Sequence, residues 1–284
     1  MARAVRFFAE TGLITAVGFF GAACLVRYSP GFEIDMREFD PRLSEATIQA
    51  LREERLRDSS LPRFALRYAA GVFRGDFGWS VSTNRPVAEL IAERAPVTLR
   101  LIAVAGIVAG CAALAAAFLK RLLRPAAVLT TASATVLLAM PAGVLALIAV
   151  FSGLPAEAAL AAVVAPPIYI YCDRLIAHQE NATCTLVAHG LGIARARVFA
   201  VHVLPVLAAE LGGLAGLAFV TAASASIPVE AVCSRPGIGQ LAWRAAMDRD
   251  MPVVAIVTVL MVVATRISAA AAGTFRLSPR GARA

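Results

Sequence analysis

Histidine and cysteine are among the residues of this sequence that could bind a metal or take part in acid–base chemistry. The three histidines are His178, His189 and His202, and their spacing does not place them on one face of a helix. The five cysteines form no C-x-x-C pair and no other spacing typical of a metal site. We therefore expect no metal site, and we interpret the histidines as surface residues and the cysteines as packing residues.

Nucleotide chemistry is the second possibility, and two stretches bear on it. A P-loop needs Gly-Lys followed by Ser or Thr, but the only lysine, Lys120, stands between Leu119 and Arg121. The stretch Gly237-Ile238-Gly239-Gln240-Leu241-Ala242 matches G-x-G-x-x-A, which indicates a dinucleotide site only between a strand and a helix. Here it follows Pro236 between two apolar segments, so it predicts a tight turn. We expect neither a catalytic residue nor a bound cofactor in this chain.

The composition is typical of a membrane protein. Hydrophobic residues make up 59% and charged residues 16% of the sequence, and the mean hydropathy is +0.74. A soluble chain is nearer half apolar and a quarter charged. We therefore expect an all-α integral membrane protein with six spans, in the apolar runs Gly12–Val26, Leu101–Leu119, Pro125–Leu154, Ala158–Cys172, Val203–Val229 and Pro252–Gly273.

Basic residues lie at the ends of these runs. The net charge of +8 therefore fits the positive-inside rule better than nucleic-acid binding. Four basic groups alternate with pairs of spans: Arg3 and Arg6; Lys120, Arg121 and Arg124; Arg174, Arg195 and Arg197; Arg276, Arg280 and Arg283. Six spans bring all four groups to one face. We expect that face, and both termini, to be cytoplasmic.

The long outer polar segment, Arg27–Pro96, has nearly balanced acidic and basic residues, which suits a folded and solvated element. Its pattern predicts a helix over Thr47–Arg57 with Ser44 as the N-cap, and a second helix that begins near Phe64. It also predicts a short amphipathic helix over Pro86–Arg94 that leads to the second span.

The inner polar segment, Asp173–His202, has apolar residues at roughly helical spacing, opposed by polar and charged ones. Gly190 and Gly192 interrupt that pattern. The segment therefore predicts two short helices that are joined at a glycine bend and lie along the membrane surface.

Two charged residues lie within apolar runs, Glu210 in the fifth and Arg266 in the sixth. A charge in hydrocarbon costs about 2.5–3.5 kcal/mol, so such residues usually face protein or water. One interpretation places both on a path for a transported solute. The other has them reach the membrane surface, or pair with each other or with a partner subunit.

The inner segment resembles a loop of a known transporter family. Ala188 stands four residues before Gly192, and Leu204-Pro205 follow at the family's spacing. The pattern is similar to the E-A-A-x3-G-x9-I-x-L-P loop of binding-protein-dependent ABC permeases, in which a short coupling helix docks on the ATPase subunit. This resemblance implies a coupling role for Ala188, His189, Gly190, Gly192, Arg195, Arg197, His202, Leu204 and Pro205.

Two outer stretches resemble the oligopeptide, dipeptide and nickel branch of the same family. One runs from Val229 to Val254, and the other includes Arg74-Gly75-Asp76-Phe77-Gly78-Trp79-Ser80 and Arg94-Ala95-Pro96-Val97-Thr98-Leu99. The resemblance implies contacts with a solute-binding protein or a partner permease at Arg74, Gly75, Asp76, Gly78, Ser80, Glu230, Pro236, Gly237, Gly239, Arg249 and Asp250. The sequence departs from the family pattern at Leu186 and Val187, where Glu and Ala are expected, and at Arg235, where an aromatic residue is usual.

The resemblance implies the type I ABC importer permease fold, with about six transmembrane helices and an extracytoplasmic helical insertion after the first. Residues 1–96 would form the first span and the insertion, and residues 97–284 the permease core with its coupling loop at 173–203. The chain would act in a bacterial cytoplasmic membrane with a homologous second permease, two ABC ATPases that bind the ATP, and an extracytoplasmic solute-binding protein. Its substrates would be peptides or similar small solutes, nickel chelates included.

Two other functions remain open on the residues alone. A secondary transporter would use an ion gradient through Glu210 and Arg266 and would need no ATPase partner. A membrane-embedded enzyme would use the inner histidines, and its activity would depend on a metal and on His189 or His202. Isolation of the complex from membranes separates these functions, because only the importer predicts ATPases in a fixed ratio.

Overall fold

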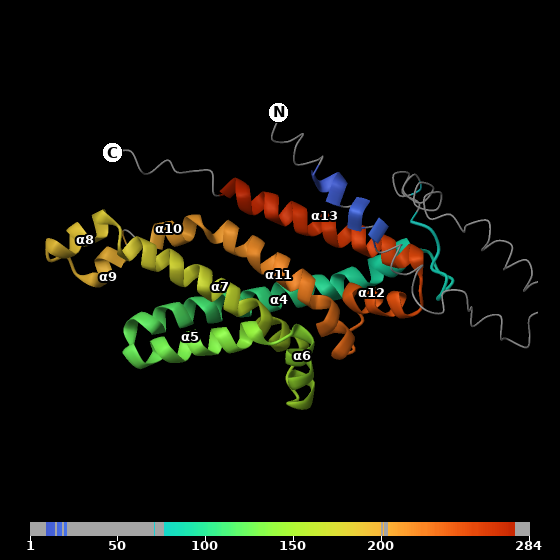
Figure 1. The fold of residues 1–284 in the computed structure, drawn as a ribbon, viewed down its shortest axis with the longest axis horizontal. Coiled ribbons are helices and arrows are strands. Elements are labelled where there is room, and N and C mark those ends of the chain that lie inside the picture. The colour runs from blue at the N-terminus through green and yellow to red at the C-terminus, as the bar shows by residue number, and fades with distance from the viewer. Residues whose placement is uncertain are drawn as a thin grey trace, which may run out of the picture. The chain divides into compact units, whose positions relative to one another are not determined.

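The computed structural model describes residues 10–14, 16–18, 20–21, 71, 77–199, 201 and 204–275, and these are mostly helical (Figure 1). Among them there is no strand, and Trp79 and Pro86 form an isolated antiparallel bridge. The helices predicted over Thr47–Arg57 and from Phe64 lie outside the described residues, as do both termini.

The chain divides into two compact units by its internal contacts. One comprises Met1–Ala95 with Leu241–Val263, and the other Pro96–Gln240 with Ala264–Ala284. The division predicted from the sequence, 1–96 and 97–284, is one of membrane topology and stays a prediction.

Four helices are long and apolar enough to cross a membrane: α4 (Val87–Leu122), α7 (Ala156–Glu180), α11 (Leu211–Val232) and most of α13 (Met251–Phe275). A fifth span results if the bent pair α5 (Arg124–Ala139) and α6 (Ala142–Phe151) counts as one. By length and composition these helices fit the predicted multi-pass membrane protein. The first predicted span, Gly12–Val26, is described only in part, and its described residues are helical.

Helix α7 is the centre of the unit that contains Pro96–Gln240, where it contacts α5, α6 and α11. It buries one stripe of apolar side chains at every fourth residue: Leu160, Val164, Ile168, Cys172 and Ile176. α4 buries alanines with the same period: Ala105, Ala109, Ala113 and Ala117. Residues four apart share one face of a helix, and small side chains let membrane helices approach closely.

The start of α4 differs from the prediction. Instead of a separate short helix over Pro86–Arg94, the structure has one continuous helix from Val87 to Leu122. Its 36 residues extend for about 54 Å, far beyond the ~30 Å of membrane hydrocarbon. Pro96 lies inside this helix without ending it. Val87 and Leu90 are buried in the first turn, so packing keeps this part of the chain helical in spite of the proline.

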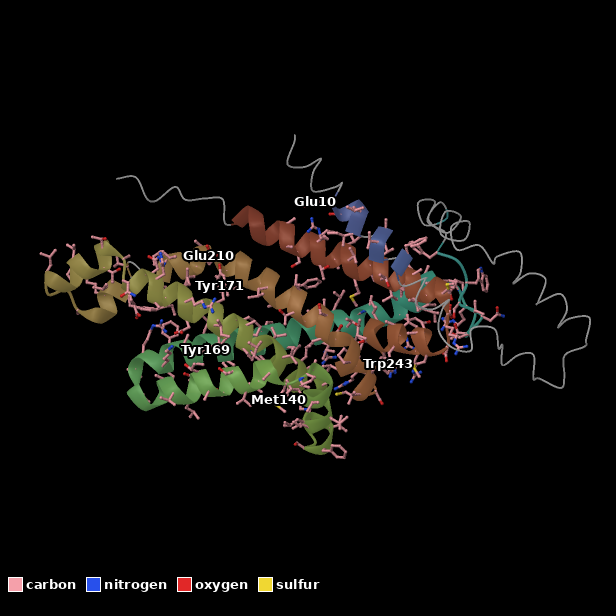
Figure 2. The ribbon with its side chains drawn as sticks, viewed as in Figure 1. Glu10, Met140, Tyr169, Tyr171, Glu210 and Trp243 are labelled. Atoms are coloured by element: carbon pink, nitrogen blue, oxygen red, sulfur yellow. The ribbon has the colours of Figure 1, made fainter. Side chains whose placement is uncertain are left out.

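The third predicted span, Pro125–Leu154, is not one straight helix. α5 ends at Ala139, and α6 begins at Ala142 after a bend of 105°; Figure 2 labels Met140 at this bend. Met140 is extended, with φ of −84° and ψ of 130°. The residue before a proline is disfavoured in the helical region, so Pro141 explains the break that the uninterrupted apolar run concealed.

The inner polar segment has the two predicted short helices. α7 continues to Glu180, and α8 (Thr183–Gly190) and α9 (Arg195–Val198) follow. α10 (Leu204–Ala209) then leads into α11. Figure 1 shows α8 and α9 together at the left of the view, beyond the end of α7.

α12 (Ile238–Met247) and α13 complete the described chain. α12 is amphipathic: Ile238, Leu241 and Ala245 are buried, whereas Trp243 and Met247 are exposed. Such a short two-faced helix suits a surface position.

Candidate functional site

The first candidate region is the α8–α9 segment, residues 183–198, which carries most of the predicted coupling residues. α8 ends at Gly190, and Gly192 follows with φ of +78°. The amide of Ile193 donates to the carbonyl of Ala188 at 3.2 Å. This bond closes the end of the helix around a left-handed residue, a conformation that glycine adopts without steric cost. Gly192 is therefore the point at which the chain turns from α8 toward α9.

Apolar side chains are exposed on this segment, which is too short to cross a membrane. Val187 and Leu191 are 54% and 75% exposed, and Ile193 is exposed beside them. Arg197 is exposed as well, whereas Ala188 is buried. Exposed apolar residues next to charged ones are typical of a surface that contacts another protein or a membrane.

An ion-pair network joins the end of α7 to the end of α4. Lys120 Nζ lies 2.8 Å from Asp173 Oδ2, and Arg121 Nη1 lies 3.1 Å from Asp173 Oδ1. Arg121 Nε also lies 3.0 Å from Glu180 Oε1, in the last residue of α7. The same guanidinium donates to the backbone carbonyl of Ala117 at 2.8 Å. Because one arginine bonds several acceptors at once, this link is stiffer than a single surface ion pair.

Two further contacts join helices of the same unit. The Tyr171 hydroxyl of α7 donates to Glu210 Oε2 at 2.7 Å, between α10 and α11, and Figure 2 labels both residues. The rings of Phe118 and Phe199 meet edge to face with centroids 5.1 Å apart. Glu210 is therefore held by a tyrosine of its own chain. Arg266 is half-buried within α13, and a place on a transport path stays a prediction for both charged residues.

A shallow hollow of about 430 Å³ lies between α11 and α13. It is lined by Gly212, Ala215, Gly216, Phe219, Ala264, Ile267 and Ser268. One hydroxyl, that of Ser268, is the only polar side-chain group in this lining, and it donates to the carbonyl of Gly216 at 3.4 Å. Neither Glu210 nor Arg266 lines the hollow, so it gives no evidence for a charged solute path.

The second candidate region is a buried carboxylate at the start of α12, here called the Glu230 cluster (Thr98, Glu230 and Ile238–Gln240). Glu230 is 0% exposed. Its Oε2 accepts the amides of Gly239 and Gln240 at 2.7 and 3.1 Å. Its Oε1 accepts the Thr98 hydroxyl at 2.7 Å, and Thr98 Oγ1 in turn accepts the amide of Ile238 at 2.7 Å. The first amides of α12 are thus satisfied by a hydroxyl from α4 and a carboxylate from α11, and the positive end of the helix dipole also favours the carboxylate.

The glycines of the G-x-G pattern make room for this carboxylate. A Cβ on Gly237 would lie closer to both Glu230 and Thr98 than van der Waals contact allows, so neither side chain could remain in place. A Cβ on Gly239 would lie 2.7 Å from the Cα of Ile227. The pattern therefore serves close packing of a helix start on a buried acid. The predicted tight turn is present only in part, because Gly239 already belongs to α12.

The third region, here called the Asp250 cluster (Ser80, Ser82, Thr83 and Asp250), ties the chain before α4 to the start of α13. Asp250 is 0% exposed. Its Oδ2 accepts the hydroxyls of Ser80 and Ser82 at 2.5 and 2.9 Å and the amide of Ser82 at 3.1 Å. The Thr83 hydroxyl donates to Ser80 Oγ at 2.7 Å. Asp250 Oδ1 is buried without a hydrogen-bond partner in the part of the chain that the structure describes.

Two arginines add ion pairs near these clusters. Arg235 lies 3.5 Å from Glu157 Oε2 at the first turn of α7. Arg85 Nη2 lies 2.5 Å from Glu93 Oε1. The hydrogen bond and charge of Glu93 raise the pKa of Arg85. Both pairs are partly exposed, so each contributes little to stability.

The structure brings together only some of the predicted outer residues. Glu230, Gly237 and Gly239 lie in one cluster, and Ser80 and Asp250 in another. Gly78 and Arg249 have positive φ of 76° and 58° and shape the chain beside the Asp250 cluster. Pro236 is exposed. Because the two acids are fully buried, they can serve a partner contact only by holding the shape of the surface; the contact itself stays a prediction.

Several predicted residues lie outside the described part: Arg74, Gly75, Asp76 and His202, together with the side chains of His189 and Arg195. Gly190, Leu204 and Pro205 are exposed. Thr98, Ser82, Asp173 and Glu180 were not predicted, although each is central to a cluster. The sequence carried no signal for them, since their partners are far away along the chain.

Comparisons of the chain with models of protein families and with curated proteins find no match. Within the described residues, no three His, Cys, Asp or Glu side chains are grouped so that they could hold a metal ion. The likeness to ABC permeases is therefore a likeness of short motifs alone.

Proposed function

We propose that the chain is a transmembrane permease subunit of an ATP-driven, binding-protein-dependent importer of the type I class. The observation that carries the proposal is the α8–α9 segment: two short helices joined at a left-handed Gly192, with exposed apolar residues, beyond the end of a candidate span. The spacing from Ala188 to Pro205 is similar to the coupling loop of such permeases. Several long apolar helices suit a chain that lines a path through a membrane.

In this proposal the α8–α9 segment docks into a separate ATPase through Val187, Leu191 and Ile193. The absence of an acidic residue at Leu186 and Val187 makes the docking surface apolar. Movement of the ATPase would then displace the end of α7. The ion pairs of Arg121 with Asp173 and Glu180 would pass that displacement to α4, because rigid elements joined by several bonds move together.

At the other predicted face, the Glu230 and Asp250 clusters would hold the loops that meet a solute-binding protein or the second permease. The homologous second permease, two ATPases and the binding protein complete the proposed complex in a bacterial cytoplasmic membrane. Peptides or similar small solutes, nickel chelates included, are the proposed substrates. ATP is bound by the ATPases, and this chain catalyses no reaction of its own.

Affinity purification of the tagged chain from its native membranes tests the proposal. We expect ATPase subunits to copurify in a fixed ratio to the chain. If the wild-type complex contains no ATPase, the importer function is wrong, and the gradient-driven alternative through Glu210 and Arg266 would be favoured.

A pair of glycine substitutions tests the coupling segment itself. Gly192→Val should lower transport and transport-coupled ATP hydrolysis, because a β-branched residue is strained at a φ of +78° by more than ~1 kcal/mol. Gly192→Asn is the matched control, and it should keep more transport, because asparagine adopts a left-handed φ more readily than a β-branched residue. Both variants should insert into the membrane normally. Unchanged transport in Gly192→Val would count against the docking role.

A further inference from the structure

The crosswise helix α6 is the most apolar element of the described chain that is not itself long enough to span a membrane. Every side chain from Ala142 to Phe151 is apolar. Ala146 and Ala149 are buried, and α6 contacts α7 and α11. Its other face is exposed, with Phe151 at its end 84% exposed. Figure 1 shows α6 standing across the direction of α5 and α7.

Contact with water is unfavourable for the exposed face of α6. A helix that lies in water or at a membrane surface has a polar face, and α6 has none. The sequence contains no charged residue between Arg124 and Glu157. The exposed apolar side chains are contiguous, on Val144, Leu147, Ile148, Val150 and Phe151. The surroundings of this face must therefore be uncharged and apolar.

A partner helix fits this face less well than lipid. Contacts between membrane helices are rich in small residues, but Ala146 and Ala149 are buried against the chain itself together with Leu145, and the other large side chains of α6 face outward. Helix α5 also exposes large apolar side chains, those of Val128, Leu129 and Val136. α5 is part of the candidate span formed by the bent pair. The same lipid acyl chains could therefore cover the exposed faces of both helices.

Backbone hydrogen bonds close the C-terminal end of α6 in a way that suits an environment without water. Gly153 has φ of +67°, and the amide of Leu154 donates to the carbonyl of Ala149 at 2.8 Å. The amide of Gly153 donates to the carbonyl of Val150 at 3.2 Å. This closure satisfies carbonyl groups that would otherwise need solvent, which hydrocarbon requires of any backbone it surrounds.

We propose that lipid acyl chains cover the outer face of α6, so that α5 and α6 form one bent span whose second helix lies crosswise within the hydrocarbon. The lengths agree with this arrangement. The 16 residues of α5 extend for about 24 Å, and a crosswise helix about 10 Å thick brings the unit to the ~30 Å of the hydrocarbon core. The inference needs only that the chain is in a membrane, and it does not rest on the importer function.

Site-specific photocrosslinking in intact cells tests this proposal with all natural partners present. 4-Benzoylphenylalanine replaces Phe151, and in a second variant Leu147, so that the test survives if one variant fails to accumulate. After irradiation, mass spectrometry is expected to find phospholipid adducts on both variants. The same photoreactive group in place of Arg244, exposed on α12, is the control and should give no such adduct.

A second measurement distinguishes water from lipid. In a Phe151→Cys variant, a water-soluble, charged maleimide is expected to leave residue 151 unlabelled in native membranes and to label it after the protein is denatured. Labelling in native membranes would show a water-facing helix. A crosslink from Phe151 or Leu147 to another protein would show a subunit interface. Either result would overturn the proposal.

Discussion

Two buried acids, Glu230 and Asp250, use their carboxylate oxygens in different ways. Each is 0% exposed and lies beside the first turn of a helix. Both oxygens of Glu230 accept hydrogen bonds, from Thr98 and from the amides that open α12. Asp250 concentrates its bonds on Oδ2, and Oδ1 has no partner among the described residues.

The difference teaches which acid needs its charge and which needs only an acceptor. At Glu230 the two oxygens meet separate groups of donors, so the whole carboxylate is engaged and its charge faces the positive end of α12. At Asp250 one oxygen atom holds Ser80 and Ser82. Glu230 thus acts as an electrostatic clamp, and Asp250 as a hydrogen-bond anchor.

The largest expected effect follows from Glu230→Ala. It should lower the free energy of unfolding by about 3–5 kcal/mol, because the donors of Thr98, Gly239 and Gln240 would remain buried without an acceptor. Thermal unfolding of the purified chain in detergent measures the loss. Glu230→Gln is the matched control, and it should lose less because it keeps one acceptor oxygen. Equal losses would show that the charge alone matters at this position.

Gly239→Ala disturbs the same cluster by a steric clash and leaves its charge unchanged. The added methyl group would lie 2.7 Å from the Cα of Ile227, so we expect a loss of about 1–3 kcal/mol from overpacking. Gly110→Ala in α4 is the control, because a methyl group there meets nothing within 4 Å. That variant should unfold at the same temperature as the wild type or slightly above it. If both variants behave alike, close packing does not explain the G-x-G pattern.

The Asp250 cluster should respond to a different change. Asp250→Asn is expected to cost about 1 kcal/mol, because the amide keeps an oxygen for Ser80 and Ser82, while its nitrogen replaces Oδ1, which has no partner among the described residues. Asp250→Ala removes the anchor and should cost about 2 kcal/mol. Unfolding midpoints of the two variants make the comparison. A loss as large for Asn as for Ala would mean that Asp250, like Glu230, depends on its charge.

The smallest expected effect is a change in the reactivity of Cys233, three residues after Glu230. Burial raises the pKa of this thiol, so less thiolate is present near neutral pH than in an ordinary cysteine. Alkylation by a maleimide should therefore be slow at pH 7 and accelerate as the pH rises. Glu230→Ala should accelerate it further by opening the cluster. Equal rates for Cys233 in the folded and the denatured chain would contradict this picture.

The sequence revealed the elements whose cause is local. Apolar runs predicted the long helices, and the interruption at Gly192 predicted the bend between two short helices. These signals are readable because membrane spans and glycine turns depend on residues that are close along the chain. Local patterns failed at Pro96 and at Pro141: packing kept the helix at the first, and the apolar run concealed a break at the second.

The clusters were beyond the reach of such patterns. Thr98 and Glu230 are 132 positions apart, and Ser80 and Asp250 are 170 apart. Arg121 and Asp173, 52 apart, each look like an ordinary residue at the end of a span. No spacing rule relates residues at such separations, because their meeting depends on how the helices between them are placed.

By itself, the sequence determined that the chain is helical and apolar enough for a membrane, and that it carries a short glycine-jointed pair of helices next to a span. Its composition and short-range periodicity suffice for those properties, since the solvent and the backbone act on each segment separately. Only the tertiary structure decided which acids are buried, which oxygens they engage, and that α6 turns away from α5. Those outcomes depend on desolvation and packing, which exist only once distant segments have come together.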